Sequence, residues 1–426
     1  MELAGWERWD KALVSVASRI QIIKALNWPV QCEQEFLSGW NKGDARLPTV
    51  AAKQCALGDE KEVLTSLMRS VDRGHPVGNW LFKTAWSYYV AARMLESAGT
   101  PDFERYSSLL YGRPDFRYRS QDMTSLDGAR EMIAVTDSLL NHTALAPIPA
   151  SLTAEDFALR LQTRIEAVFG QGIVRIVLDP NLASKAAAGG SRIVLRSTAL
   201  FSERDLDQLT EHEAFTHSLT ALNGRQQPLR ALGLGSPRTT RTQEGLATFA
   251  EILTGALDMS RLRRIALRVV MLQRGLEGAD FIEVFKGFLD AGQTEVESYR
   301  SAMRLFRGGD VRGKICFTKD GTYLEGVMSV YAFIGKVLQD GKADLMSMLF
   351  IGRVTLSDAI ALAPYRGTAL CAPLYMPPWT RDPQRILSTM AFFTATQRIR
   401  HDRLTLDRFV EYEDEVIADN PFAEGI

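Results

Sequence analysis

The apolar residues of this chain recur mostly three and four positions apart, which places them on one side of an α-helix. Trp80–Ser97 is typical, with an aromatic-rich apolar pattern that ends at Gly99 and Pro101. The pattern predicts that residues 1 to about 140 are helical, with few strands. Further helices are predicted at Leu152–Phe169, Met259–Arg274, Phe281–Leu289, Glu295–Arg307, Tyr323–Leu338 and Pro383 to about Ile399.

Two segments favour β-strands most clearly, Val174–Leu178 and Arg192–Leu195. They are joined by Asp179–Gly190, and the second leads into a helix through Ser202 and Asp205, which have the spacing of a helix-capping pair. The sequence therefore predicts an α+β fold that is predominantly helical and contains a small sheet.

A stretch rich in Ala and Pro, Thr143–Pro149, precedes the part of the chain that holds the strands. We expect residues 1–145 to form an N-terminal helical scaffold region and residues 146–426 to form the region that carries the chemistry.

Composition narrows the class of protein. A chain of 426 residues with 46% hydrophobic content can bury a substantial core, and a net charge of -1 gives no general attraction to nucleic acid. No apolar run approaches the roughly 20 residues that cross a bilayer, and the start of the chain lacks a basic segment followed by an apolar one. We expect a cytoplasmic protein with neither a nucleic-acid nor a membrane partner. The scattered cysteines favour reduced thiols; they are Cys32, Cys55, Cys316 and Cys371.

The most specific chemical signal is a pair of histidines close together in the chain. His212 is followed by Glu213, and His217 comes five positions after the first histidine. Neutral imidazole is a common zinc ligand, and a zinc hydrolase keeps its general base beside the first ligand. On an ideal α-helix a spacing of five turns the two rings about 140° apart, so a π-type bulge is needed to bring them together. The alternative is a surface helix whose histidines are unrelated.

A third ligand is expected on a neighbouring helix. After a break at Asn223–Gly224 the helical pattern resumes at Thr240, which has capping-box spacing to Gln243. Glu244 and Glu251 share the side opposite to the apolar stripe, so Glu244 is free to face a cleft. The alternative for Glu244 is an ordinary solvated glutamate. The stripe consists of Leu246, Phe249, Leu253 and Leu257.

Together, the His-Glu-three-residues-His string and the later Arg241–Ala247 (Arg-Thr-Gln-Glu-Gly-Leu-Ala) resemble the family of QEGLA-motif proteins. Its bacterial members are described as flavohaemoglobin expression-modulating proteins, and its animal relatives are microtubule-associated tyrosine carboxypeptidases. Three further segments read like the family, so the resemblance covers roughly residues 60 to 420. The segments are Ser107–Gly112, Ser236–Thr240 and Phe317–Asp320, the last with Tyr323, Leu324 and Gly326 downstream.

The resemblance implies that His212, His217 and Glu244 hold Zn2+ and that Glu213 is catalytic. A strand followed by the zinc helix is the order of a zincin-like metallopeptidase core. In such folds an edge strand beside the metal can pair with extended substrate, and Arg192–Leu195 is the candidate; an ordinary hairpin is the alternative.

Weaker candidates complete the site. A tetrahedral oxyanion needs a donor besides zinc, which Tyr323 or Lys319 could supply, with a packing or surface role as the alternative. Cleavage at a C-terminus also requires a partner for a free carboxylate, for which Arg241 is the first choice and Arg238 the second. The alternative for Arg241 is an arginine in solvent. The basic face of Arg261–Arg274 could receive an acidic substrate tail, although such faces are more often solvated.

We therefore expect a zinc-dependent metallopeptidase, of the carboxypeptidase type, that acts on a peptide or protein C-terminal tail. Release of an aromatic residue such as tyrosine is implied only by the resemblance. The alternative is a catalytically silent, metal-stabilised regulatory or binding protein. The presence of Glu213 favours the enzyme, because a structural site needs no base.

Overall fold

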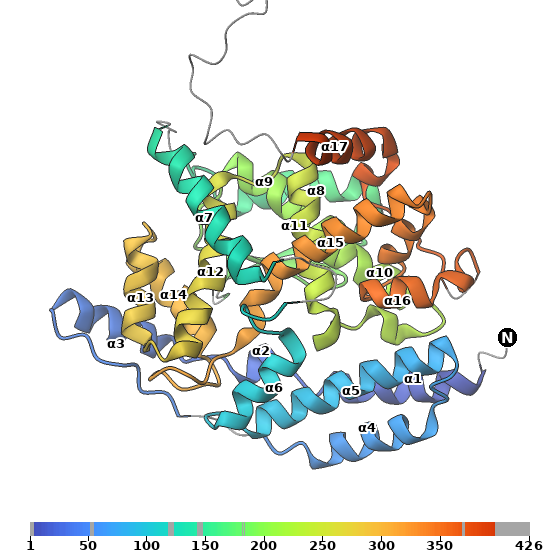
Figure 1. Cartoon of the computed structure of the whole chain (residues 1–426), viewed down its shortest axis with the longest axis horizontal. Helices are drawn as coiled ribbons and strands as arrows, with labels where there is room; N and C mark the ends of the chain where they lie inside the picture. The colour runs from blue at the N-terminus through green and yellow to red at the C-terminus, as the bar shows by residue number, and fades with distance from the viewer. Residues whose placement is uncertain are drawn as a thin grey trace, which may run out of the picture. The chain divides into compact units, whose positions relative to one another are not determined.

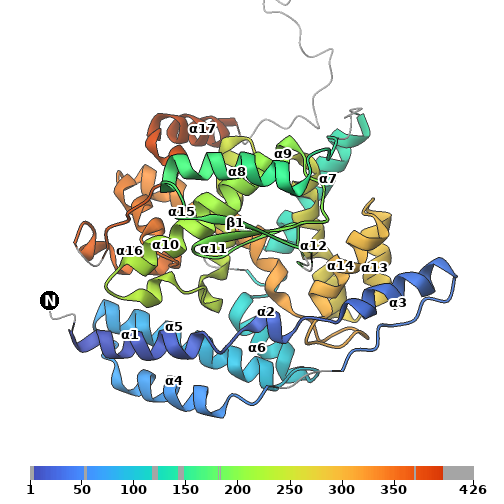
Figure 2. The same cartoon turned by 180° about the vertical axis from the view of Figure 1, so that it is seen from behind.

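Helices dominate the computed structural model, which describes residues 4–51, 55–117, 123–142, 148–180, 182, 184–368 and 371–396. The first seven helices confirm the predicted helical start, and the helix predicted from Trp80 is α5. In α5, Pro76 occupies the first turn and the His75 side chain accepts a hydrogen bond from the Val77 amide. α1, α4 and α5 pack on one another and lie side by side in both views (Figures 1 and 2). The helices are α1 (Ala4–Ala17), α2 (Ile22–Ala25), α3 (Val30–Asn41), α4 (Gly58–Ser70), α5 (Pro76–Glu96), α6 (Pro101–Tyr111) and α7 (Ser125–His142).

A three-stranded sheet follows α8 (Ala154–Phe169), with strands β1 (Arg175–Asp179), β2 (Ala186–Ala188) and β3 (Arg192–Arg196). The strand order is β1-β3-β2, with β1 parallel and β2 antiparallel to β3. Both predicted strands are present, but the expectation that Arg192–Leu195 is an edge strand is wrong. The reason is β2, whose three alanines show no alternation of polar and apolar residues and which takes the edge beside β3. Figure 2 shows α8 running along the sheet.

The sheet leads into the helix that carries the histidines. α9 (Glu203–Leu209) begins with a capping box in which the Ser202 and Asp205 side chains bind each other's backbone amides, as the sequence predicted. It continues into the π-helix η1 (Thr210–Ser218) and then α10 (Leu219–Gln226). η1 packs against β2 and β3, so the sheet supports the histidine segment.

α11 (Thr240–Thr254) crosses α15 (Thr322–Gln339) at very close range. A Cβ atom on Gly245 would lie 2.3 Å from the Gly326 backbone, and one on Gly326 would lie 2.2 Å from the Arg241 carbonyl oxygen. Two glycines therefore allow the backbones to touch, one residue after Glu244. The capping box predicted for Thr240 and Gln243 is wrong. A 3-10 turn (Pro237–Thr239) leads directly into α11, and the Gln243 side chain instead accepts a hydrogen bond from Thr220.

A second helical group contains α12 (Met259–Glu277), α13 (Phe281–Asp290) and α14 (Glu295–Phe306), which match the predicted helices closely. Their buried side chains form an aromatic-rich core with α3, in which Phe36 makes an edge-on contact with Phe285. α7 packs on α12, so the first part of the chain supports this group. The remaining segments are the 3-10 turns Arg230–Gly233, Thr318–Gly321, Ala343–Phe350, Ala363–Tyr365 and Pro378–Arg381, and the helices α16 (Leu356–Ala361) and α17 (Pro383–Thr396).

The chain separates into two compact units, residues 1–381 and 382–426. In the second, α17 confirms the predicted last helix as far as Thr396, and its predicted end at Ile399 lies outside the described residues. The boundary predicted between residues 145 and 146 also lies outside them, so the division into 1–145 and 146–426 stays a prediction. None of the helices in the described ranges is long and apolar enough to cross a membrane.

The close crossing of α11 and α15 leads to a first prediction. We expect Gly245→Ala to lower the free energy of unfolding by about 1–3 kcal/mol or more, because the added methyl group meets backbone that cannot rotate away. Gly58→Ala is the matched control, since a Cβ there meets nothing within 4 Å at the start of α4. Chemical denaturation of both variants measures the effect. Equal stability of Gly245→Ala and wild type would show that the crossing is not tight.

Candidate metal centre

A π-helix brings the two histidines together, as their spacing predicted. In a π-helix the backbone hydrogen bonds run from residue i to i+5, so five residues make about one turn and both rings leave the same side. η1 spans Thr210–Ser218 and includes both residues. The His212 and His217 rings lie edge to face, with centroids 4.8 Å apart and an interplanar angle of 87°. The alternative of unrelated surface histidines does not fit this geometry.

Side-chain donors hold the wide turn in place. The Thr216 hydroxyl donates to the carbonyl oxygen of Glu211 at 2.9 Å, five residues back, and Arg353 donates to that of His217 at 3.2 Å. The Ser218 hydroxyl donates to the Gly189 carbonyl at 2.8 Å, which fastens η1 to the turn between β2 and β3. The unusual helix is thus fixed from both sides by its neighbours.

Glu244 completes a three-residue cluster, with one of its oxygens facing both rings. Oε2 lies 3.5 Å from Nε2 of His212 and 3.5 Å from Nε2 of His217. Ligands of a tetrahedral metal with bonds of about 2.0–2.2 Å are about 3.3–3.5 Å apart, so the spacing suits zinc. Oε2 is also buried and accepts no hydrogen bond within the described part of the chain. An orphaned carboxylate oxygen between two imidazoles is the arrangement that a cation would satisfy.

The charges around the cluster favour a positive charge at its centre. Burial lowers the pKa of His212, but the carboxylates of Glu244 and Glu251 outweigh this effect and raise it to about 10. Burial raises the pKa of Glu244, but Lys319 and the two histidines lower it well below its ordinary value. Glu244 is therefore an anion at neutral pH, as a metal ligand must be.

Glu251, which the sequence analysis did not assign to the site, orients His212. Nδ1 of His212 donates to Oε1 of Glu251 at 2.6 Å, which leaves Nε2 to face Glu244 and His217. Glu251 is fully buried, and Arg261 donates to the same oxygen at 2.7 Å. Burial raises the pKa of Glu251, but Arg261 and His212 outweigh it and lower the pKa to about 2. The sequence feature that could have pointed to this role is the position of Glu251 on the same side of the helix as Glu244.

The arginines of the basic face Arg261–Arg274 are mostly not solvated, because most of them lie beside acidic side chains. That the face receives an acidic substrate tail stays a prediction. Arg261 is paired with Glu251 at the site, and Arg263 with Asp137. Arg268 is mostly buried near Asp320, and Arg274 alone among the arginines of this face is exposed. The charge pattern of the sequence could not reveal these ion pairs, because the acidic partners lie on other elements of the fold.

The predicted catalytic residues lie around the cluster. Glu213 is half-buried in η1, and its negative charge acts on His212 and Arg261. Lys319 donates from Nζ to Oε1 of Glu244 at 3.2 Å. The ring of Tyr323 lies beneath this amine, with Nζ 5.4 Å from its centroid. Lys319 and Tyr323 are thus beside a candidate ligand, which is a requirement for their predicted role at an oxyanion.

The two arginines predicted to bind substrate already have carboxylate partners. Arg238 holds both oxygens of Asp358, at 2.7 and 2.8 Å. Arg241 forms an ion pair with Glu325, whose pKa burial raises to about 7 in spite of that arginine. Both pairs connect the start of α11 to other elements. Their role in binding substrate stays a prediction.

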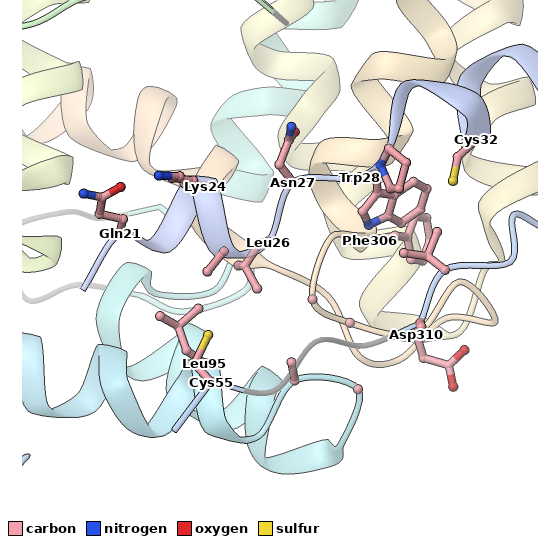
Figure 3. Close-up of a pocket in the computed structure, with 18 of the residues that line it drawn as sticks. Gln21, Lys24, Leu26, Asn27, Trp28, Cys32, Cys55, Leu95, Phe306 and Asp310 are labelled. Carbon is pink, nitrogen blue, oxygen red and sulfur yellow. The ribbon is translucent and has the colours of Figure 1, made fainter. Parts of the chain in front are cut away.

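A cavity of about 940 Å³ lies elsewhere, between α2, the start of α3 and the loop after α14 (Figure 3). Trp28, Phe306, Leu26 and Leu95 supply its apolar lining, and Cys32 and Cys55 also line it. None of the three residues of the metal cluster lines this cavity. We therefore locate the candidate chemistry at the cluster, on its donor set, rather than in this cavity.

Comparison with known proteins identifies the family of the chain. The model of the family described as microtubule-associated tyrosine carboxypeptidase (MATCAP) matches residues 34–398. The chain belongs to this family. The match includes every residue of the metal cluster, and it begins closer to the N-terminus and ends sooner than the resemblance over residues 60 to 420 suggested. No curated protein matches the chain.

The contact between Glu251 and His212 leads to a second prediction. We expect Glu251→Gln to weaken zinc binding about 10- to 100-fold, since the amide is a poorer acceptor for Nδ1–H and leaves Arg261 without its charge partner. Competition with a chromophoric chelator measures the affinity. Glu62→Gln, an exposed acid on α4, is the control. Unchanged affinity in Glu251→Gln would contradict the orienting role.

A third prediction follows from the raised pKa of His212. A ring with a pKa of about 10 holds a proton at neutral pH, and that proton must leave before Nε2 can bind a metal. Apparent zinc affinity should therefore rise about tenfold per pH unit above pH 7, until the pH approaches that pKa. Zinc titrations at several pH values measure the slope, and in Glu251→Gln the affinity should stop rising at a lower pH, because the pKa of His212 loses the contribution of the Glu251 charge. An affinity independent of pH would contradict the electrostatic argument.

Proposed function

We propose that the chain is a zinc-dependent carboxypeptidase with a zincin-like core. The observation that carries the proposal is the convergence of His212, His217 and Glu244, with the buried Oε2 of Glu244 facing both Nε2 atoms. Membership of the MATCAP family supports an enzyme of the carboxypeptidase kind that acts on a peptide or protein. The order of strand β3, then the histidine helix, supports the zincin comparison.

The donor set supports zinc and a catalytic rather than a structural site. Two imidazoles and one carboxylate are a known ligand set of catalytic zinc, and they leave a fourth position open. When bound, zinc would polarise a carbonyl group and acidify a water molecule. Structural zinc sites close with a fourth protein ligand, and the described residues offer the cluster three.

The surrounding residues can perform the proton transfers of hydrolysis. Glu213 would take a proton from the attacking water molecule while the water oxygen bonds to the carbonyl carbon. It would then deliver that proton to the amine nitrogen as the C–N bond breaks. Lys319 or Tyr323 would donate a hydrogen bond to the oxyanion that forms from the carbonyl. The position of Lys319 beside Glu244 supports that role.

The substrate that we propose is a C-terminal tail of a peptide or protein. An aromatic last residue such as tyrosine is suggested by the family description. We also propose that the protein acts in the cytoplasm, and its four cysteines, all free thiols, are consistent with a reducing compartment.

A fourth prediction tests catalysis directly. We expect Glu213→Gln to reduce turnover of C-terminal peptides by on the order of 10²- to 10⁴-fold, because the amide cannot accept the proton of water. Zinc content should stay at the wild-type level, since Glu213 is not among the three ligands. Mass spectrometry of a peptide library, with Glu62→Gln as the control, gives the products. Chelation should abolish wild-type activity and added zinc should restore it.

Two outcomes would contradict the proposal. Equal product spectra from wild type and Glu213→Gln would contradict the assignment of Glu213 as the general base. Full activity after complete metal removal would exclude the metal from the reaction. A zinc-loaded protein that cleaves none of the library would instead favour a silent, metal-stabilised binding protein.

A further inference from the structure

Several cationic side chains gather beside the metal cluster, on elements that the proposed chemistry uses only in part. Arg268 comes from α12, Arg304 from α14, Arg307 from the residue after α14, and Lys319 from the turn before α15. α12 and α14 pack on each other and on the turn Thr318–Gly321. Both views show α12 and α14 as neighbours (Figures 1 and 2).

The carboxylates in this cluster do not balance its positive charge. Asp320, which is 1% exposed, accepts two hydrogen bonds from Arg304 at 2.6 and 2.7 Å. Arg268 is 4.0 Å from the same carboxylate, beyond hydrogen-bond distance. Arg307 has no carboxylate partner among the described residues and lies over the Phe317 ring instead. One acid therefore faces three buried or mostly buried guanidinium groups.

The spare donors of this cluster can be identified. The Nε atoms of Arg268 and Arg307 are buried and make no hydrogen bond to any described residue. Burial and repulsion from Arg304 lower the pKa of both arginines to about 10, which still leaves them charged at neutral pH. Buried cations with unused donors are costly unless an anion completes the site. The unpaired Nε of Arg268 faces Asp320 inside the protein, whereas the terminal nitrogens of its guanidinium make no hydrogen bond to any described residue and are not buried. Arg307 is 6% exposed, so the terminal nitrogens of Arg268, whose side chain is 19% exposed, are the donors that an anion from outside can reach.

Arg268 is connected to the metal cluster through one aromatic ring. Its guanidinium carbon lies 6.0 Å from the centroid of Tyr323, and Nζ of Lys319 lies 5.4 Å from the same centroid. Lys319 in turn donates to Glu244. One aromatic ring therefore lies between the Arg268 guanidinium and the Lys319 amine that contacts the candidate ligand Glu244.

We propose that Arg268 binds the free α-carboxylate of the substrate's last residue, with Arg307 as a buried charge behind it. This inference rests on the proposed carboxypeptidase function and names the group that restricts it to chain ends. The α-carboxylate carbon of a last residue lies only about 3–4 Å from the carbon of the bond to be cut, so its partner must stand close to the metal. A guanidinium fork can hold both carboxylate oxygens at once. An internal peptide segment carries an uncharged amide at that position and would leave the cationic cluster unsatisfied.

The test compares two peptides of the same sequence with tyrosine as the last residue, one ending in a free carboxylate and the other in an amide. We expect wild type to prefer the free acid by on the order of 100-fold in kcat/KM, mostly through KM. Arg268→Gln should bring the ratio of kcat/KM for the two peptides close to one, because kcat/KM falls for the free-acid peptide and stays unchanged for the amide. Arg268→Lys should keep part of the preference, because it keeps the charge but loses the fork. The ratio is measured within one preparation, so partial misfolding does not affect it.

Arg274→Gln, at the exposed end of the same helix, is the matched control and should keep the wild-type ratio. A second readout needs no turnover: fluorescence polarisation of the two peptides on zinc-loaded Glu213→Gln, with and without Arg268→Gln. Loss of the difference between acid and amide in the double variant would support the proposal.

An Arg268→Gln enzyme that keeps the full preference would overturn the assignment, as would a wild type that treats acid and amide alike. Cleavage of neither peptide would contradict the proposed function. In that case equal binding of both peptides by Glu213→Gln would overturn this inference as well, whereas tighter Arg268-dependent binding of the acid would support it.

Discussion

The structure around the candidate site depends on one costly arrangement, an ionised carboxylate buried between two imidazoles with an oxygen that no described residue satisfies. Lys319 and the two histidines stabilise the charge of Glu244, but a buried oxygen that lacks a hydrogen bond still costs free energy. The helix crossing and the π-helix both place side chains at this point. A cation bound there would satisfy that oxygen, so metal binding and stability should be linked.

Several independent features hold the three side chains in position. Gly245 and Gly326 let α15 approach α11 next to Glu244, so the turn that carries Lys319 lies beside the carboxylate. The π-helix turns both histidines the same way. Glu251 and Arg261 then fix the His212 ring from behind. The shape of the backbone thus sets where the three side chains lie, and buried ion pairs set how they are oriented. Such support lets a site keep its geometry before substrate binds.

Local patterns predicted most of the helices, both longer strands, the cap at Ser202 and the π-type distortion, because each depends on residues close in sequence. The capping box at Thr240 was wrong since the preceding Pro237–Thr239 turn already starts the helix. The edge position of β3 was wrong because a three-residue strand of alanines has no detectable alternation. Contacts across the fold, such as Arg238 with Asp358 and Arg304 with Asp320, follow from tertiary packing and leave no periodic signal. The three residues that the resemblance implies as ligands lie together, and whether they bind a metal stays a prediction. The contact between Glu251 and His212 became visible only in three dimensions.

The most direct measurement is the anomalous scattering of crystals grown with zinc and recorded at the zinc absorption edge. We expect one strong peak per chain, bonded to Nε2 of His212, Nε2 of His217 and Oε2 of Glu244 at about 2.0–2.2 Å, with the fourth position held by solvent or substrate. A fully zinc-loaded protein with its only peak elsewhere, or with the Glu244 carboxylate turned away from both rings, would contradict the proposed metal centre.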